Sequence, residues 1–128
     1  MNFTGTILLV DDEPHIRKFV SLILRQLGTP VLFEAGNGEE ALAIYQRENP
    51  DLVLLDISMP MMDGLETLKK IREFDPDAVV IMLTSLVNRQ SIEEALAHGA
   101  VNYIRKDTPK EKIAQALGET IDECFKQE

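Results

Sequence analysis

Short apolar runs alternate along the chain with longer segments of helical periodicity. Three runs of four to six residues are too short for helices and are typical of strands that are buried on both faces. They span residues 7–10, 52–55 and 78–83. Two weaker runs, at 31–33 and 101–104, are shorter or interrupted by polar residues, which is typical of edge strands. The pattern therefore predicts five strands, of which three are central.

Helices are predicted between these runs. In the first of them, apolar residues recur every three or four positions from Ile16 to Leu27, with Pro14 in the first turn and Gly28 at the end. The other helices are predicted over residues 38–48, 64–73, 89–98 and 109–126. Every predicted strand is thus followed by a helix.

This alternation predicts an α/β fold with a doubly wound parallel sheet. Right-handed crossovers between parallel strands place helices on both faces of such a sheet. The flavodoxin-like strand order 2-1-3-4-5 fits best, because it puts the weak runs 31–33 and 101–104 at the two edges. A length of 128 residues fits one domain, which we expect to span residues 1–128.

Charge and composition limit the kinds of binding partner that the protein can have. The chain has 13 Lys and Arg against 22 Asp and Glu, a net charge of -9, which argues against direct binding of nucleic acid. No apolar run approaches the roughly 20 residues of a membrane span, no secretory signal is visible, and Cys124 alone forms no internal disulfide. We expect a soluble, cytoplasmic protein that binds proteins or cations, with no membrane contact.

Candidate functional residues follow the predicted strands. In an open parallel sheet, ligands bind beyond the carboxyl ends of the strands, where the strand order changes direction. The residues at these ends are three acids, a hydroxyl pair, a further acid and a lysine. In chain order they are Asp11-Asp12-Glu13, Asp56, Thr84-Ser85 and Lys106.

Three carboxylates at one edge favour a bound cation. Two carboxylates about 4 Å apart repel by about 4 kcal/mol at an effective dielectric of about 20, so Asp11, Asp12 and Asp56 need a counterion. Mg²⁺ is favoured over Ca²⁺, because it uses few carboxylates and retains water and phosphate ligands. A cation there would neutralise a phosphoryl group beside a carboxylate nucleophile, while Lys106 and Thr84 contact its oxygens.

Four motifs along the chain resemble the receiver domains of two-component response regulators. They are residues 7–14, 50–60 followed by 62–64, 79–85 and 99–106. Each motif alone is weak, but together they follow the family's order and spacing across nearly the whole chain.

The resemblance implies that Asp56 accepts a phosphoryl group from a phosphohistidine on a sensor histidine kinase or a phosphotransfer protein. It also implies that Asp12 ligates Mg²⁺ directly and that Asp11 reaches the ion through water. Asp56 and the main-chain carbonyl of Ser58 would complete the protein ligands.

The resemblance implies a switch as well. Thr84 and Lys106 would bind the phosphoryl oxygens, and Tyr103 would turn inward as Thr84 moves toward the phosphate. This would remodel the surface of the fourth helix, the fifth strand and the fifth helix, to which a downstream protein binds. Such a protein modifies only itself and slowly loses its phosphoryl group, so we do not expect an enzyme with an external substrate.

One position departs from the family pattern, in which the lysine precedes a proline. Here Asp107 follows Lys106, and a cis peptide without proline costs about 2.5 to 4 kcal/mol. We therefore expect a trans peptide, with Lys106 aimed differently and Asp107 adding negative charge.

This departure leaves a protein-interaction module that is not phosphorylated as the main alternative. A phosphatase with an aspartyl nucleophile is less favoured, because its general acid would stand where this chain has Ser58. A structural role for Thr84 is also open, although Ser85 is the better candidate for capping the fourth helix.

Overall fold

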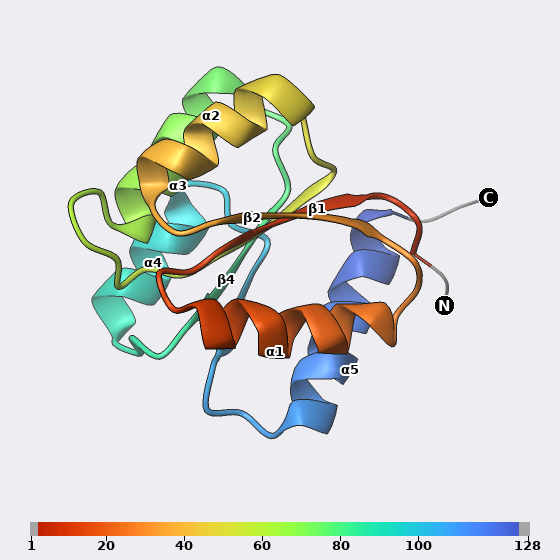
Figure 1. Cartoon of the computed structure of the whole chain (residues 1–128). Helices are drawn as coiled ribbons and strands as arrows, with labels where there is room; N and C mark the ends of the chain where they lie inside the picture. Colours follow the sequence, from red (N-terminus) through yellow and green to blue (C-terminus); the bar gives the residue numbers. More distant parts are fainter. Residues whose placement is uncertain (1–2, 126–128) are drawn as a thin grey trace.

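The computed structural model describes residues 3–125 and contains five strands and five helices that alternate along the chain (Figure 1). The strands are β1 (Thr6–Val10), β2 (Val31–Ala35), β3 (Leu52–Leu55), β4 (Val80–Thr84) and β5 (Asn102–Arg105). The helices are α1 (Pro14–Arg25), α2 (Gly38–Glu48), α3 (Gly64–Phe74), α4 (Arg89–Ala97) and α5 (Lys110–Cys124). All strand pairs are parallel, and the order β2-β1-β3-β4-β5 confirms the predicted fold.

The register brings the strand ends together at one edge of the sheet. Val10, the last residue of β1, lies beside Ala35 of β2 and Leu55 of β3. Every residue of β3 and β4 is buried, whereas only the last residue of β2 is. This difference explains why the apolar run of the edge strand β2 is weak.

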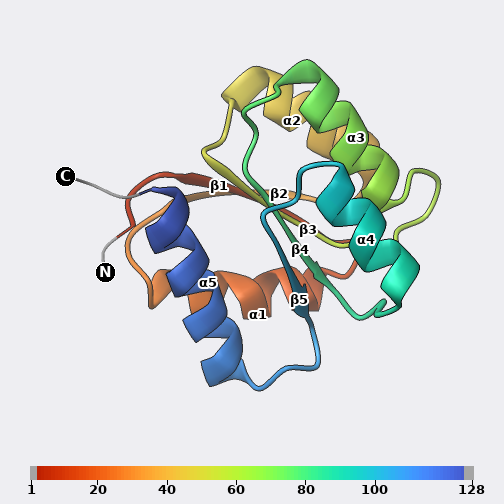
Figure 2. The same cartoon turned by 180° about the vertical axis from the view of Figure 1, so that it is seen from behind.

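Helices cover both faces of the sheet. Helices α1 and α5 lie on one face and α2, α3 and α4 on the other, as the views from opposite sides show (Figures 1 and 2). Successive strand residues point to opposite faces, so Leu8 and Val10 join the core under α2, α3 and α4, while Ile7 and Leu9 join the core under α1 and α5. Two cores explain why the central strands are apolar at every position.

The end of the first helix differs from the prediction. Helix α1 ends at Arg25 and is capped by Gln26, before Gly28. Gly28 serves a different contact, because its φ is +155° and a Cβ there would lie 2.2 Å from the carbonyl oxygen of Phe3. Phe3 and Gly28 form a parallel bridge, so this glycine permits two backbone segments to approach.

Two other helix boundaries also depend on local chemistry. Helix α4 is capped by Asn88, whose side chain accepts the N–H of Ser91, so Ser85 does not cap it. Helix α5 begins at Lys110 after Pro109, and its predicted end at residue 126 lies outside the described residues. Helix α5 has 15 residues, and no helix between residues 3 and 125 is long and apolar enough to cross a membrane.

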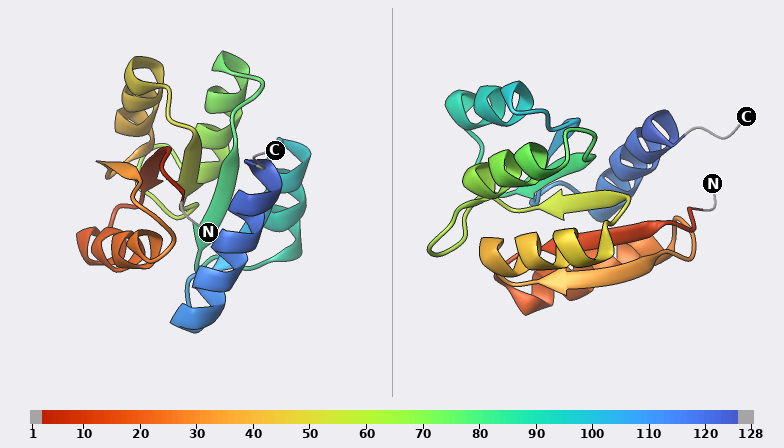
Figure 3. Two further views of the ribbon diagram at one scale, coloured as in Figure 1. Left: turned by 90° about the vertical axis from the view of Figure 1, so that its right-hand side faces the viewer. Right: turned by 90° about the horizontal axis from the view of Figure 1, so that it is seen from above.

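The two ends of the described chain meet on one side of the molecule. The rings of Phe3 and Phe125 lie 5.4 Å apart between their centroids. The views in Figure 3 show the N-terminal segment beside the end of α5. The strand ends that carry the acids lie at the opposite edge of the sheet, away from this contact.

Candidate functional site

Three acids meet at the carboxyl ends of two neighbouring strands. Asp11 and Asp12 follow β1, and Asp56 follows β3. The N–H of Asp56 donates to the Val10 carbonyl at 2.9 Å. Carboxylate oxygens of the three acids lie within 4.8 Å of one another. Asp11 is 6% exposed and Asp56 only 2%, whereas Asp12 is exposed. The clustering predicted from the strand ends is confirmed.

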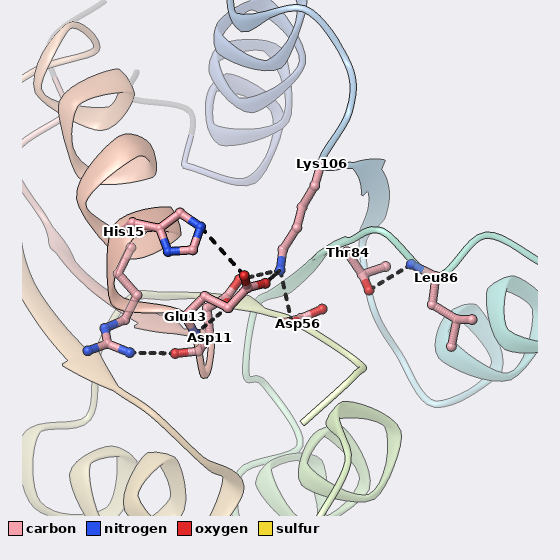
Figure 4. A network of polar contacts seen from close by, with 8 residues as sticks. Asp11, Glu13, His15, Asp56, Thr84, Leu86 and Lys106 are labelled. Carbon is pink, nitrogen blue, oxygen red and sulfur yellow. Dashed lines mark hydrogen bonds and ion pairs between the residues drawn. The ribbon is translucent and has the colours of Figure 1, made fainter. Parts of the chain in front are cut away.

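Lys106 reaches into this cluster from the end of β5 (Figure 4). Its Nζ lies 2.5 Å from Asp11 Oδ2 and 3.0 Å from Asp56 Oδ2, and its side chain is 11% exposed. The N–H of Lys106 donates to the Thr84 carbonyl at 3.0 Å, so the pairing with β4 continues through this residue. The lysine is therefore aimed by the sheet and not by the loop that follows.

The departure at Asp107 does not disturb the site. The peptide after Lys106 is trans, as predicted, but the expectation that Lys106 is aimed elsewhere is wrong. The Asp107 carboxylate turns to Arg105, with 2.8 Å between Oδ2 and Nη2. Its charge is thus paired outside the site, so the structure removes the reason for favouring a module that is not phosphorylated.

Burial and charge shift the ionisation of the site residues. Burial raises the pKa of Asp11, and the Asp56 charge adds to the rise, while hydrogen bonds from Lys106 and the Glu13 N–H oppose it. Burial alone would lower the pKa of Lys106, but its hydrogen bonds and charge pairing with Asp11 and Asp56 outweigh this and raise it. The cluster thus has three carboxyl groups, and Lys106 pairs with two of them, Asp11 and Asp56.

The Asp56 carboxylate has one free oxygen. Its Oδ2 accepts the hydrogen bond from Lys106, but its Oδ1 is buried and has no hydrogen-bond partner among residues 3–125. A buried acceptor without a partner is costly and calls for an explanation such as a bound ion. Hard carboxylate oxygens are the donors that Mg²⁺ prefers, so the residues present fit this ion.

The loop after β3 keeps the backbone around Asp56 compact. Gly64 begins α3, and its N–H donates to the Ile57 carbonyl at 2.8 Å. A Cβ at Gly64 would lie 2.0 Å from the Asp56 carbonyl oxygen. Ser58 lies on this loop, and no hydrogen bond within the described chain occupies its carbonyl.

Thr84 and Tyr103 both contact Leu86, in the loop between β4 and α4. The Thr84 side chain is fully buried, and its Oγ1 accepts the N–H of Leu86 at 3.2 Å (Figure 4). The Tyr103 hydroxyl, from β5, donates to the Leu86 carbonyl. Burial, together with the Asp56 charge, raises the pKa of Tyr103. Thr84 bonds this loop and not the acids.

One residue at the site was missed by the sequence analysis. Arg17 of α1 donates from Nη1 to the Asp11 carbonyl at 2.6 Å and from Nε to Glu34 at 2.8 Å. Its position, six residues after Asp11, is polar on a helix that otherwise packs apolar residues inward. Arg17 lies beside the apolar stripe and does not interrupt it, so no pattern in the sequence marks this residue.

The parallel sheet, with acids and a lysine where its strand order changes direction, defines a flavodoxin-like α/β protein. Such acids and a lysine are the groups that bind a cation and a phosphate. Residues 7–118 match the family model of the response regulator receiver domain, so the chain belongs to this family. It is 35% identical to the chemotaxis protein CheY of Bacillus subtilis over 116 residues, which cover 91% of this chain and 97% of that one.

Solved structures agree with this assignment. A CheY-like receiver domain protein from Methanospirillum hungatei superposes with a TM-score of 0.87 at 31% identity, over 97% of this chain and 98% of that one. CheY in a CheX–CheY–BeF3–Mg complex from Borrelia burgdorferi gives 0.85 at 35% identity, over 95% and 90%. Receiver domains act as signalling switches, generally bind Mg²⁺ in an acidic pocket, and interact with histidine kinases and downstream partners.

Proposed function

We propose that this protein is a phosphorylation-controlled switch in which Asp56 is the phosphoacceptor. The observation that carries the proposal is the Asp56 carboxylate, which is almost fully buried and holds one oxygen against Lys106 while the other is unpaired. A nucleophile needs such a free oxygen, and the hydrogen bond from Lys106 to Oδ2 holds the carboxylate in one orientation.

The transfer follows from this geometry. Asp56 Oδ1 attacks the phosphorus of a phosphohistidine, the P–N bond breaks, and its electron pair returns to the imidazole nitrogen, which takes up a proton. The product is an acyl phosphate on Asp56, which water later hydrolyses to inorganic phosphate and the free carboxylate. Lys106 stabilises one phosphoryl oxygen, and Thr84 donates its hydroxyl to another.

Mg²⁺ is the proposed cofactor. Asp12 and Asp56 would bind it directly, Asp11 through water, and Ser58 through its main-chain carbonyl. The ion would neutralise the charge that the phosphoryl group brings to the acids. The three carboxylates against one ammonium group, and the unpaired Asp56 oxygen, support this assignment.

Phosphorylation would change the loop between β4 and α4, in which Leu86 contacts both Thr84 and Tyr103. When the Thr84 hydroxyl turns to the phosphoryl group, it gives up the hydrogen bond from the Leu86 N–H. Tyr103 is tied to the same residue through the Leu86 carbonyl, so the loop and the ring move together. The affected surface is that of α4, β5 and α5, which would bind the downstream protein.

The proposal also includes the phosphoryl donor, the cellular location and the partners of the protein. The phosphoryl donor would be a histidine kinase or phosphotransfer protein, and no external substrate is processed. We place the protein in the cytoplasm, as a single receiver domain over residues 1–128, without nucleic acid or membrane as partner. The net charge of -9 supports the exclusion of nucleic acid.

Intact-protein mass spectrometry tests the chemistry. The protein is incubated with acetyl phosphate and MgCl2, beside Asp56→Asn and beside a sample that contains EDTA. We expect a gain of one phosphoryl group in the wild type, and none in the variant or in EDTA. Labelling that persists in Asp56→Asn would overturn Asp56 as the acceptor, and an unlabelled wild type would overturn the switch.

A further inference from the structure

The Arg17 side chain connects three elements beside the acidic site. It starts from α1, donates to the carbonyl of Asp11 at the end of β1, and pairs with Glu34 on the edge strand β2. The Arg17 side chain is 18% exposed and that of Glu34 is 49% exposed. The guanidinium is therefore largely out of water, unlike that of an ordinary surface pair, and its position is set by two hydrogen bonds.

Arg17 completes the set of contacts that hold Asp11. The Asp11 N–H donates to the Ala35 carbonyl at 3.1 Å, and its Oδ1 accepts the Glu13 N–H at 2.9 Å. Its Oδ2 contacts Lys106, and its carbonyl accepts from Arg17. Every polar atom of this residue is thus held. Because the peptide unit is planar, holding the Asp11 carbonyl also fixes the amide of the next residue.

That next residue is Asp12, which has no comparable support of its own. Its side chain is exposed, and no described residue forms a hydrogen bond to its carboxylate. The direction of the Asp12 carboxylate therefore depends on its backbone, whose preceding peptide Arg17 holds. We propose that Arg17 is a positioning residue that aims the Asp12 carboxylate at Mg²⁺, an inference that rests on the proposed metal site.

Charge alone makes the opposite prediction, which makes the inference testable. A guanidinium close to a cation site repels the cation, so removing only its charge would strengthen Mg²⁺ binding. Removing its hydrogen bond to Asp11 would loosen Asp12 and weaken binding. Arginine suits the positioning role, because its planar fork donates to a carbonyl and a carboxylate at once, which a lysine does not reproduce.

The test is an NMR titration of backbone amide shifts with MgCl2. It compares wild type with Arg17→Met and Arg17→Lys. We expect the Mg²⁺ Kd to rise about tenfold in Arg17→Met, as is usual when a group that supports a metal ligand is lost, and to rise less in Arg17→Lys. Arg47→Met is the matched control, because it removes the same charge and a 2.9 Å ion pair on α2.

Phosphorylation by acetyl phosphate gives a second reading. In Arg17→Met, the dependence of the initial rate on MgCl2 should shift to higher concentration with an unchanged plateau. Thermal unfolding in EDTA shows that each variant is folded at the assay temperature.

Three results would overturn the inference. An Mg²⁺ Kd for Arg17→Met equal to that of Arg47→Met would leave Arg17 a structural residue. A lower Kd would show that its charge dominates. A wild type that binds no Mg²⁺ would overturn this inference and the proposed cofactor together, so the two failures are distinguishable.

Discussion

The carboxylates at the end of the sheet share one ammonium group, that of Lys106. This imbalance of charge affects the pKa values of the residues there. Lys106 Nζ lies 2.5 Å from Asp11, 3.0 Å from Asp56 and 3.9 Å from Glu13, so its charge is divided among three acids. Burial therefore dominates the ionisation of Asp11 and raises its pKa despite the ion pair. A residue that is costly to ionise thus lies at the proposed metal site, which is typical of functional positions.

The variant Asp11→Asn should show this cost as a pH dependence. Burial raises the pKa of Asp11 in the folded protein above its ordinary value of 3.8, so the folded state keeps this proton to higher pH than the unfolded chain. Wild-type stability is consequently lost as pH rises from the unfolded pKa through the folded one. Because Asn does not titrate, the free energy of unfolding of Asp11→Asn, relative to wild type, should grow across this window and then level off.

Urea unfolding in EDTA at a series of pH values measures this difference. Asp122→Asn, on the exposed side of α5, removes the same charge away from the site and serves as the control. Parallel stability curves for wild type and Asp11→Asn would contradict the prediction.

Among the elements, α3 begins in direct contact with the backbone of Asp56. Its first residue, Gly64, packs against the Asp56 backbone so tightly that a Cβ would lie 2.0 Å from the Asp56 carbonyl oxygen. The Asp63 side chain caps the helix by accepting the N–H of Glu66 at 2.9 Å. The first turn of α3 therefore packs against the site through Gly64 and is capped by the side chain of Asp63.

Gly64→Ala should therefore destabilise the protein. Overpacking of this kind costs about 1 to 3 kcal/mol in the free energy of unfolding, because the backbone of Asp56 has to move. Gly118→Ala on α5 is the matched control, since its Cβ would meet only Leu27 Cδ2 at 3.6 Å. That change should stabilise by about 0.5 to 1 kcal/mol, the usual gain from replacing glycine within a helix.

Urea denaturation of both variants gives the comparison, and mass spectrometry after acetyl phosphate treatment shows whether Gly64→Ala also slows labelling. A Gly64→Ala protein as stable as Gly118→Ala would contradict the close approach between α3 and Asp56.

For the molecule as a whole, the acids of the site add to an unfavourable net charge. The chain carries -9, and its three clustered carboxylates stand at the end of a sheet that is buried between two cores. Because the carboxylates come together only in the folded protein, a cation that binds them stabilises the fold and not the unfolded chain.

Mg²⁺ should accordingly raise the melting temperature of the wild type. At an Mg²⁺ concentration of about 100 times Kd, binding adds about 2.7 kcal/mol to the free energy of unfolding. Asp56→Asn removes one ligand and should lose most of the rise, while its metal-free form should melt higher than that of the wild type because one buried charge is gone.

Thermal unfolding followed by circular dichroism provides the measurement, with NaCl at matched ionic strength as the control for screening. An equal rise in NaCl, or in Asp56→Asn, would mean that Mg²⁺ acts on the net charge and not at the site.

Much of the fold could be predicted from the chain because its signals are local. The central strands are apolar at every position since both faces are covered, and Asp11 and Asp56 follow them directly. The prediction failed where a boundary depended on a distant segment. Gly28 does not end α1, because its backbone is required for the contact with Phe3.

The strand order, the strand ends and the acids that meet there could be predicted from the amino-acid sequence, because apolar periodicity and parallel pairing lead to all three. How the side chains contact one another is seen only in the folded protein. Lys106 reaches Asp56 across 50 positions of the chain because β5 pairs with β4 through Lys106 while Asp107 turns to Arg105. Arg17 reaches Asp11 and Glu34 because α1 packs across β1 and β2. Such contacts depend on how whole elements pack, which no local pattern specifies.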